Sequence, residues 1–288
     1  MTFSIVAREG EAYGVAVASK FLAVGAVVPA ARVGVGAVAT QSWARVAYIS
    51  ELLGRLEAGE DAESALASAT ATDPGSATRQ LGVVGRESAA TFTGDECLPW
   101  CGGVARVADD GESAYAIQGN ILVGPEVVEA MEAAWNDSAG STFPQRLLAA
   151  LTAGDAAGGD SRGRQSAAVL AVEPGSGYDR SGVAADLRVD DHADPVGELG
   201  RLLDEWELYF GRPEDVRPLE GDLADEVAER LARIGHAPEG DGVEAALVAW
   251  AGEVNYESRL APGGIDRRVL EALRTATDPT AASDATSD

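Results

Sequence analysis

A threonine at position 2 and a single lysine are the residues whose types and spacing best suit chemistry. Thr2 becomes the first residue once Met1 is removed, which its small side chain favours, and Lys20 lies eighteen residues further on. A threonine hydroxyl is a poor nucleophile unless a base lies beside it, and an N-terminal threonine supplies that base through its own α-amino group. This amine titrates near pH ~8 in model compounds, so it can take the hydroxyl proton and return it to a leaving amine. The pattern predicts amide hydrolysis with Thr2 as the nucleophile.

Lys20 is the only lysine among 22 basic residues, in a chain with 47 acidic residues. An acidic, lysine-poor composition is typical of halophilic proteins, which stay soluble in concentrated salt. A lysine retained against that background is expected in a site, because a buried ammonium shifts its pKa and serves chemistry that arginine cannot. We expect it to keep the Thr2 amine neutral through like-charge repulsion. The alternative is that Lys20 has no special role and lies on an exposed turn.

The alternation of polar and apolar residues at the start of the chain predicts a hairpin with its turn at residues 9–12. Counting outward along antiparallel partners puts Arg8 opposite Tyr13 and Thr2 opposite Ser19. The lysine that follows is then within reach of the threonine. Ser19 becomes a candidate substrate-binding residue.

An acyl-transfer site also needs hydrogen-bond donors aimed at the developing oxyanion. The candidate catalytic donors are the side-chain amides of Gln41 and Asn120. Their neighbours Thr40, Gln118 and Gly119 are substrate-binding candidates, and we expect residues 118–120 to form a turn whose glycine lets backbone N–H groups approach a ligand. The alternative is that residues 40–41 and residues 118–120 are structural turns whose polar groups are hydrogen-bonded within the protein.

One glycine-rich segment carries two arginines, Arg162 and Arg164, in a chain that has few positive charges. Paired guanidinium groups favour a carboxylate or phosphate. They predict a small-molecule substrate with an anionic group. The alternative is that these arginines hold two strands together by pairing with nearby aspartates (Asp160, Asp186, Asp190).

Metal and cofactor sites have weak support. Acidic residues and a histidine at 186–194 resemble a metal cluster, but alternate strand residues point to opposite faces, and an acidic run is typical of a solvated loop. Cys97 and Cys101 lack the second pair that a zinc site needs, which favours a local disulfide or two small buried thiols. Nucleotide-binding glycine motifs are missing. We expect no metal and no cofactor, and metal-dependent hydrolysis at 186–194 stays an alternative.

The net charge of −25 argues against nucleic acid and anionic membranes as partners, since an acidic surface gains no counterion release from another polyanion. Apolar stretches are too short to span a bilayer. Residues 1–8 lack the features of a secretory signal. These features predict a cytoplasmic protein.

Strands, helices, strands, helices and strands follow one another along the chain, which favours an α+β layered sandwich over a parallel sheet. We expect one domain over residues 1–205 and a linker over 206–221, which is rich in proline, glycine and charge. A small helical module is expected over 222–274. The tail, 275–288, is too polar to become ordered.

Six blocks in order carry a family resemblance: residues 1–8, 17–29, 34–41, 117–124, 158–168 and 186–192. Together they closely resemble the prokaryotic domain-of-unknown-function family DUF1028, which is grouped with the N-terminal-nucleophile (Ntn) hydrolases. The resemblance covers residues 1 to about 205. It implies a four-layer αββα sandwich with the nucleophile at the mouth of the sheet, and it implies no substrate.

The pattern departs from that of proteasome-type relatives, which place an aspartate and a second lysine further along the chain. Here the corresponding residues are Ala18, Ser19, Lys20 and later Arg32, so their mechanism transfers only to Thr2. The overall prediction is an Ntn amidohydrolase for a small amide or short peptide-like substrate. A non-catalytic binding or structural protein on the same fold is the alternative.

Residues 219–259 faintly resemble the small helical fold that binds peptidoglycan in other proteins. In a chain this acidic we expect a packing or oligomerisation module instead. A homo-oligomer therefore remains open.

Overall fold

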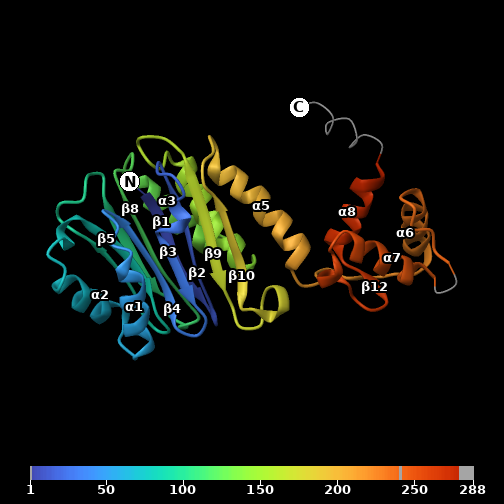
Figure 1. Ribbon diagram of the computed structural model, residues 1–288, viewed down its shortest axis with the longest axis horizontal. Helices are drawn as coiled ribbons and strands as arrows, with labels where there is room; N and C mark the ends of the chain where they lie inside the picture. Colours follow the sequence, from blue (N-terminus) through green and yellow to red (C-terminus); the bar gives the residue numbers. More distant parts are fainter. Residues whose placement is uncertain (1, 240–241, 279–288) are drawn as a thin grey trace. The chain divides into compact units, whose positions relative to one another are not determined.

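The structure is a computed structural model that describes residues 2–239 and 242–278 (Figure 1). It divides into two compact units, the first up to Leu203 and the second from Asp204. Within the described ranges, no helix combines the length and the apolar character that crossing a bilayer requires.

The first unit contains an antiparallel sheet of six strands. Its register pairs Arg8 with Tyr13 and Phe3 with Ala18, which confirms the predicted hairpin and places Thr2 beside Ser19. The strand order is β10 (Val183–Val189), β9 (Ser166–Val172), β2 (Ala12–Ser19), β1 (Thr2–Glu9), β8 (Ser113–Asn120) and β7 (Gly102–Val107).

A second antiparallel sheet has four strands in chain order. They are β3 (Pro29–Arg32), β4 (Gly36–Ser42), β5 (Arg79–Val84) and β6 (Ala89–Thr93). Residues 33–35 form the turn between β3 and β4. Gly34 adopts φ of 71°, a left-handed conformation that glycine tolerates without a steric penalty.

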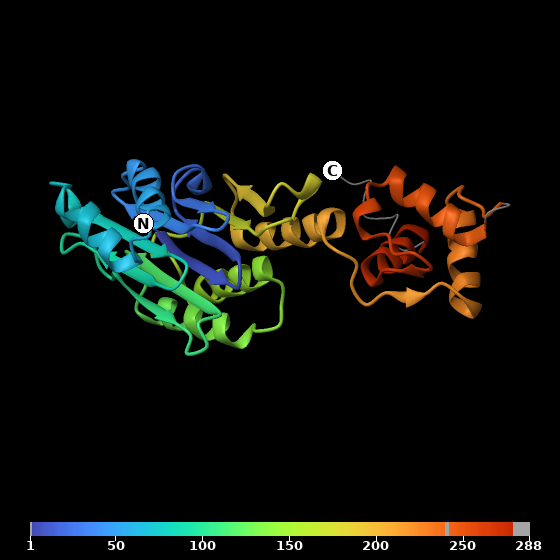
Figure 2. The same cartoon turned by 90° about the horizontal axis from the view of Figure 1, so that it is seen from below.

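The two sheets face each other, and helices pack on their other faces. Helices α1 (Ala47–Glu57) and α2 (Ala62–Ala71) contact the four-stranded sheet, while α3 (Glu126–Asp137) and α4 (Phe143–Ala156) contact the six-stranded sheet. Figure 2 shows the blue α1 and α2 and the green α3 and α4 on opposite sides of this unit. The predicted mixture of α-helices and antiparallel sheets is confirmed.

Alternation along the strands fills the space between the sheets. Val6 of β1, Val17 of β2, Ala39 of β4 and Ala116 of β8 all belong to one buried apolar cluster. Their strand neighbours point the other way, as Val38 of β4 does by packing with α1 and α2. A side chain two residues from one of the inward residues therefore also points between the sheets.

The second unit is mainly helical, as predicted. Its helices are α6 (Gly221–Arg233), α7 (Gly242–Glu253) and α8 (Arg267–Thr277), with a two-stranded ladder of β11 (Arg217–Pro218) and β12 (Gly264–Ile265). Their apolar faces share one core that contains Leu231, Trp250 and Leu270.

Helix α5 (Pro195–Phe210) runs across the division between the units, so residues 206–210 of the expected linker are helical. Residues 275–277 of the expected tail form the end of α8. Residues 279–288 of that tail lie outside the described part of the chain. Short 3-10 helices cover Val24–Ala26, Ser76–Thr78, Tyr178–Arg180 and Glu257–Arg259.

Candidate functional site

One end of the space between the sheets is polar, whereas the rest is apolar. Strands β1, β5 and β9 begin at this end, and β2, β4 and β8 finish there. We call it the Thr2 end. The buried polar side chains that the strand alternation turns inward here are Thr2, Ser4, Ser19, Gln41, Gln80, Gln118 and Asn120.

Thr2 contacts three residues that the sequence singled out. Its Oγ1 lies 3.2 Å from Oγ of Ser19, and its carbonyl oxygen accepts a hydrogen bond of 3.3 Å from Nε2 of Gln41. In the sheet register its partner on β8 is Asn120. The candidates from four separate strands therefore meet around the first residue of β1.

A network of side-chain amides joins the two sheets at this end. Oε1 of Gln80 accepts hydrogen bonds of 2.8 Å from both Nε2 of Gln41 and Nδ2 of Asn120. Nε2 of Gln80 donates to the carbonyl oxygen of Gly119 at 2.7 Å and to Oγ1 of Thr93 at 3.0 Å. Gln80 was not among the predicted site residues. The signal that could have found it is a glutamine at a strand end, as at Gln41.

Gln118 belongs to the same network through Ser4. Its Nε2 donates to Oγ of Ser4 at 2.6 Å, and that hydroxyl donates to Oε1 of Gln41 at 2.7 Å. Oε1 of Gln118 is buried without a hydrogen-bond partner among the described residues. It lies over Gly82, where an added Cβ would be 2.2 Å away.

Two expectations about these segments are wrong. Gln118, Gly119 and Asn120 are the last residues of β8 rather than a turn, because β1 and β7 on either side engage their backbone. Thr40 points away from the space between the sheets, on the face of β4 that α1 covers, and its Oγ1 donates to the carbonyl oxygen of Arg45 at 3.4 Å.

Lys20 is exposed, contrary to the expectation of a buried ammonium. The reason is that β2 ends at Ser19 and the chain turns away. Its backbone N–H donates to Oδ2 of Asp160 at 2.8 Å, and its Nζ donates to the carbonyl oxygen of Arg164 at 3.1 Å. No carboxylate of residues 2–239 and 242–278 forms an ion pair with it.

The two arginines of the glycine-rich segment pair with aspartates. Arg162 forms an ion pair of 3.2 Å with the buried Asp160, which is one of the pairings weighed from the sequence. Arg164 pairs through Nε with Oδ1 of Asp155 at 2.7 Å, and this partner was not foreseen. Both guanidinium groups remain partly exposed.

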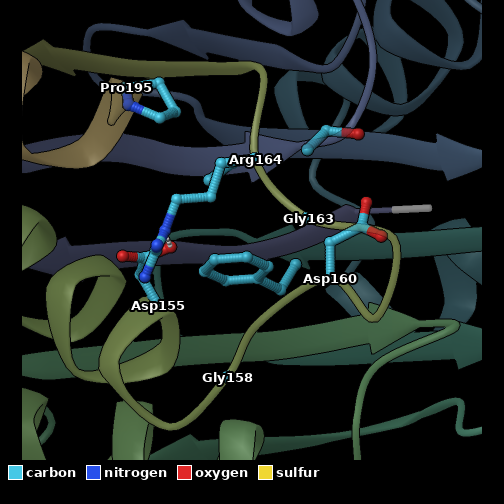
Figure 3. A pocket seen from close by; sticks show the side chains of 9 residues that line it. Asp155, Gly158, Asp160, Gly163, Arg164 and Pro195 are labelled. Atoms are coloured by element: carbon cyan, nitrogen blue, oxygen red, sulfur yellow. Dashed lines mark hydrogen bonds and ion pairs between the residues drawn. The ribbon is translucent and has the colours of Figure 1, made fainter. Parts of the chain in front are cut away.

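A pocket of about 280 Å³ lies beside Ser19 (Figure 3). In Figure 3 the side chains of Arg164 and Asp155 point toward each other on one side, and Asp160 lies on the other. The ring of Phe3 packs against Gly159, where a Cβ would come within 2.9 Å. The lining residues are Phe3, Ala18, Ser19, Asp155, Gly158, Asp160, Gly163, Arg164 and Pro195.

Ser19 connects this pocket with the nucleophile candidate, because it lines the pocket and its hydroxyl contacts that of Thr2. The sequence did not single out Phe3, Asp155 or Pro195 for this place. They come from three distant segments of the chain. The residue pattern within one segment does not show that it will contact another.

The other residues considered as metal ligands form contacts with their neighbours in the sequence. Nδ1 of His192 bonds with backbone atoms of Asp194, and Asp186 lies 3.4 Å from Nε of Arg188. Across the described residues, no three histidine, cysteine or acidic side chains gather as metal ligands. Cys97 and Cys101 are free thiols, and burial raises the pKa of Cys101.

Comparisons with known proteins identify relatives of both units. A family model described as a family of unknown function, DUF1028, matches residues 2–199, and a model described as a putative peptidoglycan binding domain matches residues 209–273. The crystal structure of protein SPO2555 from Silicibacter pomeroyi, which carries the DUF1028 name, is similar, with a TM-score of 0.62 and 32% identity. That match covers 78% of this chain and 92% of the other. A search of curated proteins gives no match.

Proposed function

Because this chain belongs to DUF1028, a family of unknown function, we propose its activity from the site itself: an N-terminal-threonine amidohydrolase for small amides. The fold we propose for it is the four-layer αββα sandwich of the Ntn hydrolases. One observation carries the proposal. The Thr2 hydroxyl stands at the polar end of the space between the sheets, 3.2 Å from the hydroxyl of Ser19, and Ser19 is one of the residues that line a pocket.

In the proposed reaction the Thr2 hydroxyl attacks the carbonyl carbon of the amide, and the α-amino group of Thr2 accepts the hydroxyl proton. The C–N bond then breaks, and the proton passes to the departing nitrogen. Water attacks the resulting ester with the same amine as base. This second step releases the acid and restores the hydroxyl.

The neighbouring side chains receive separate roles in this proposal. Ser19 orients the attacking hydroxyl. Asn120, the register partner of Thr2, is the proposed oxyanion donor, because the described contacts use its Nδ2 once, toward Gln80. Gln41 is a positioning residue, since its Nε2 is already engaged with three acceptors.

Lys20 is assigned to substrate binding rather than to tuning the amine of Thr2. Its side chain is exposed, and water screens the field of an exposed charge. Arg164 lines the pocket and is assigned to the same role. Arg162 is left with the structural role of holding Asp160.

Labelling of the purified protein in molar salt with a β-lactone probe, which acylates N-terminal threonines, tests the proposal. We expect intact mass to show loss of Met1 and one adduct, mapped by peptide sequencing to Thr2. Thr2→Ala should abolish the adduct, whereas Thr72→Ala, on the distant α2 end, should keep it. Equal labelling of Thr2→Ala, or retention of Met1, would favour the non-catalytic binding protein.

The match of residues 209–273 to a putative peptidoglycan binding domain supports a second candidate function for the second unit. We propose that this unit binds a cell-wall glycan peptide. Sedimentation with purified peptidoglycan tests this, with cellulose as the control polymer. Equal sedimentation with both, together with a cytoplasmic location in cell fractionation, would leave the unit a packing or oligomerisation role.

A further inference from the structure

Large apolar side chains are exposed on the loops that leave the Thr2 end. We call them the apolar rim: Phe21, Leu22, Trp43, Val46, Leu98 and Val123. Trp43 is 71% exposed and Leu22 is 59% exposed, although leaving such groups in water is unfavourable. Clustered exposure of this kind marks an interaction site more often than single exposed residues do.

The rim residues lie on segments next to the ends of three strands at the Thr2 end, β2, β4 and β8. The loop after β2 carries Phe21 and Leu22 directly after Lys20, and the segment after β4 carries Trp43 directly after Ser42. The loop with Leu98 is held to the end of β8, because the carbonyl oxygen of Leu98 accepts from the backbone N–H of Ile121 at 3.0 Å.

The opposite end of the first unit exposes other kinds of apolar side chain. Among its described residues, the exposed large apolar side chains there are Val33, Val107 and Tyr178, which are two small aliphatic groups and one with a hydroxyl. Tryptophan, phenylalanine and leucine are exposed only at the Thr2 end of the described first unit. The apolar exposure is therefore concentrated where the nucleophile candidate lies.

Cationic groups lie next to the rim in a chain with a net charge of −25. Nζ of Lys20 bonds only with the carbonyl oxygen of Arg164 among the described residues, so its charge is not neutralised. Within the same ranges, Arg164 bonds through Nε alone, which leaves its two terminal nitrogens for an anion. Guanidinium and ammonium groups together suit a carboxylate.

We propose that the substrate is an N-acyl amino acid. Its acyl chain contacts the apolar rim, its amide carbonyl meets Thr2, and its carboxylate is held by Lys20 and Arg164 at the pocket. The inference rests on the proposed amidohydrolase function and names its substrate class. Hydrolysis transfers the acyl group from nitrogen to Oγ1 of Thr2 and then to water, so the products are a fatty acid and a free amino acid.

Charge decides between this occupant and a second copy of the chain. At low ionic strength, two copies that joined at the rim would bring together two molecules that each carry −25, and this unscreened repulsion opposes association. A small ligand with one carboxylate meets Lys20 and Arg164, and the two aspartates that line the pocket, Asp155 and Asp160, are each already paired with an arginine. A dimer seen by light scattering whose formation Trp43→Ser abolishes would overturn the assignment.

Hydrolysis rates for three amides test the acyl and carboxylate parts separately. The probes are N-acetylglycine, N-decanoylglycine and N-ethyldecanamide, which has the decanoyl chain and no carboxylate. We expect kcat/KM for N-decanoylglycine to exceed that for each of the other two by at least about tenfold, because most of the added methylenes and the carboxylate contact the protein. Equal values for the acetyl and decanoyl compounds would overturn the role of the rim.

Matched variants assign these preferences to residues. Trp43→Ser and Leu98→Ser should each lower the decanoyl-to-acetyl ratio at least about threefold, and Val107→Ser, at the opposite end, should leave it unchanged. Lys20→Met should lower the ratio of N-decanoylglycine to N-ethyldecanamide at least about threefold, and Arg164 should keep part of the preference. An equal fall for both substrates would instead show that Lys20 acts on the Thr2 amine, and would overturn its role toward the carboxylate.

The β-lactone experiment separates failure of this inference from failure of the proposed function. A labelled Thr2 without preference for long acyl chains or carboxylates overturns the substrate class alone. An unlabelled Thr2 without hydrolysis of any probe overturns both. Calorimetry of Thr2→Ala with N-decanoylglycine, below its micelle-forming concentration, should show binding, and Lys20→Met on that background should weaken it about tenfold.

Discussion

The hydroxyl groups of Thr2 and Ser19 lie 3.2 Å apart across the pair formed by β1 and β2. This contact exists in only one register, because a slip of one residue would turn one of the two side chains to the helix-covered face of the sheet. The hairpin register therefore positions the nucleophile candidate.

Removing the second hydroxyl should slow the first step. We predict that Ser19→Ala lowers the rate of β-lactone labelling at Thr2 about fivefold to tenfold, as expected for one lost orienting hydrogen bond. Ser19→Thr keeps a hydroxyl and should restore most of the rate. If the alanine and threonine variants react alike, Ser19 has no orienting role.

Loss of Gln80 should weaken the whole amide network. Gln80→Leu leaves the buried amide of Asn120 without its acceptor, removes one of the three acceptors of Gln41 and removes the donor to the carbonyl oxygen of Gly119, which predicts a loss of about 2–4 kcal/mol in the free energy of unfolding. Urea unfolding measures this. Gln165→Leu removes a more exposed contact with Asp191 and should change stability by less than about 0.5 kcal/mol.

The ion pair between Asp73 and Arg79 should make stability depend on acid pH. The hydrogen bond from Arg79 lowers the pKa of Asp73 to about 2 in the folded state. Because the pKa is lowered, the stabilisation is present above the unfolded-state value near pH ~4 and is lost as pH falls toward ~2.

Asp73→Asn tests this pH window. It should lower the Tm at neutral pH, by the equivalent of about 1 kcal/mol, since Tyr48 and Arg79 both lose a charged acceptor. The difference from wild type should shrink as pH falls from ~4 to ~2. A constant difference across that range would contradict the assigned ion pair.

In the second unit, Arg259 is buried and contacts Glu214 at 3.2 Å and the buried Asp266 at 3.6 Å. Arg259→Leu leaves the buried Asp266 without its ion-pair partner and removes one of the arginines that pair with Glu214, which predicts a loss of about 3–5 kcal/mol. Hydrogen exchange of the α6 and α8 amides in the full chain measures it. Arg233→Leu breaks an exposed pair with Glu229, and protection in α6 should then change by less than about 0.5 kcal/mol.

Local patterns predicted much of this fold. Polar and apolar alternation with a turn at residues 9–12 was enough to pair Arg8 with Tyr13, because strand faces and hairpin turns are properties of neighbouring residues. The N-cap of α2 is likewise a local contact, in which the Asp61 side chain accepts from the backbone N–H of Ser64 three residues along.

The candidate site was predicted only in part, because several of its contacts join distant segments. Thr2, Ser19, Gln41 and Asn120 meet as expected, yet the acceptor that holds two of them, Gln80, lies on a strand that carried no chemical motif. Lys20 was expected inside on the basis of its rarity. The low number of lysines reflects selection on the overall composition, and it does not show where the side chain of Lys20 points.

The amide network has a further effect on the sheets themselves. Donors and acceptors match in one alignment only, so Gln80 of one sheet and Asn120 of the other fix how far the two layers can slide along each other. The valines and alanines elsewhere between the layers would accept a small displacement. The position of Thr2, the first residue of β1, is therefore set by the facing four-stranded sheet as much as by its own six-stranded sheet.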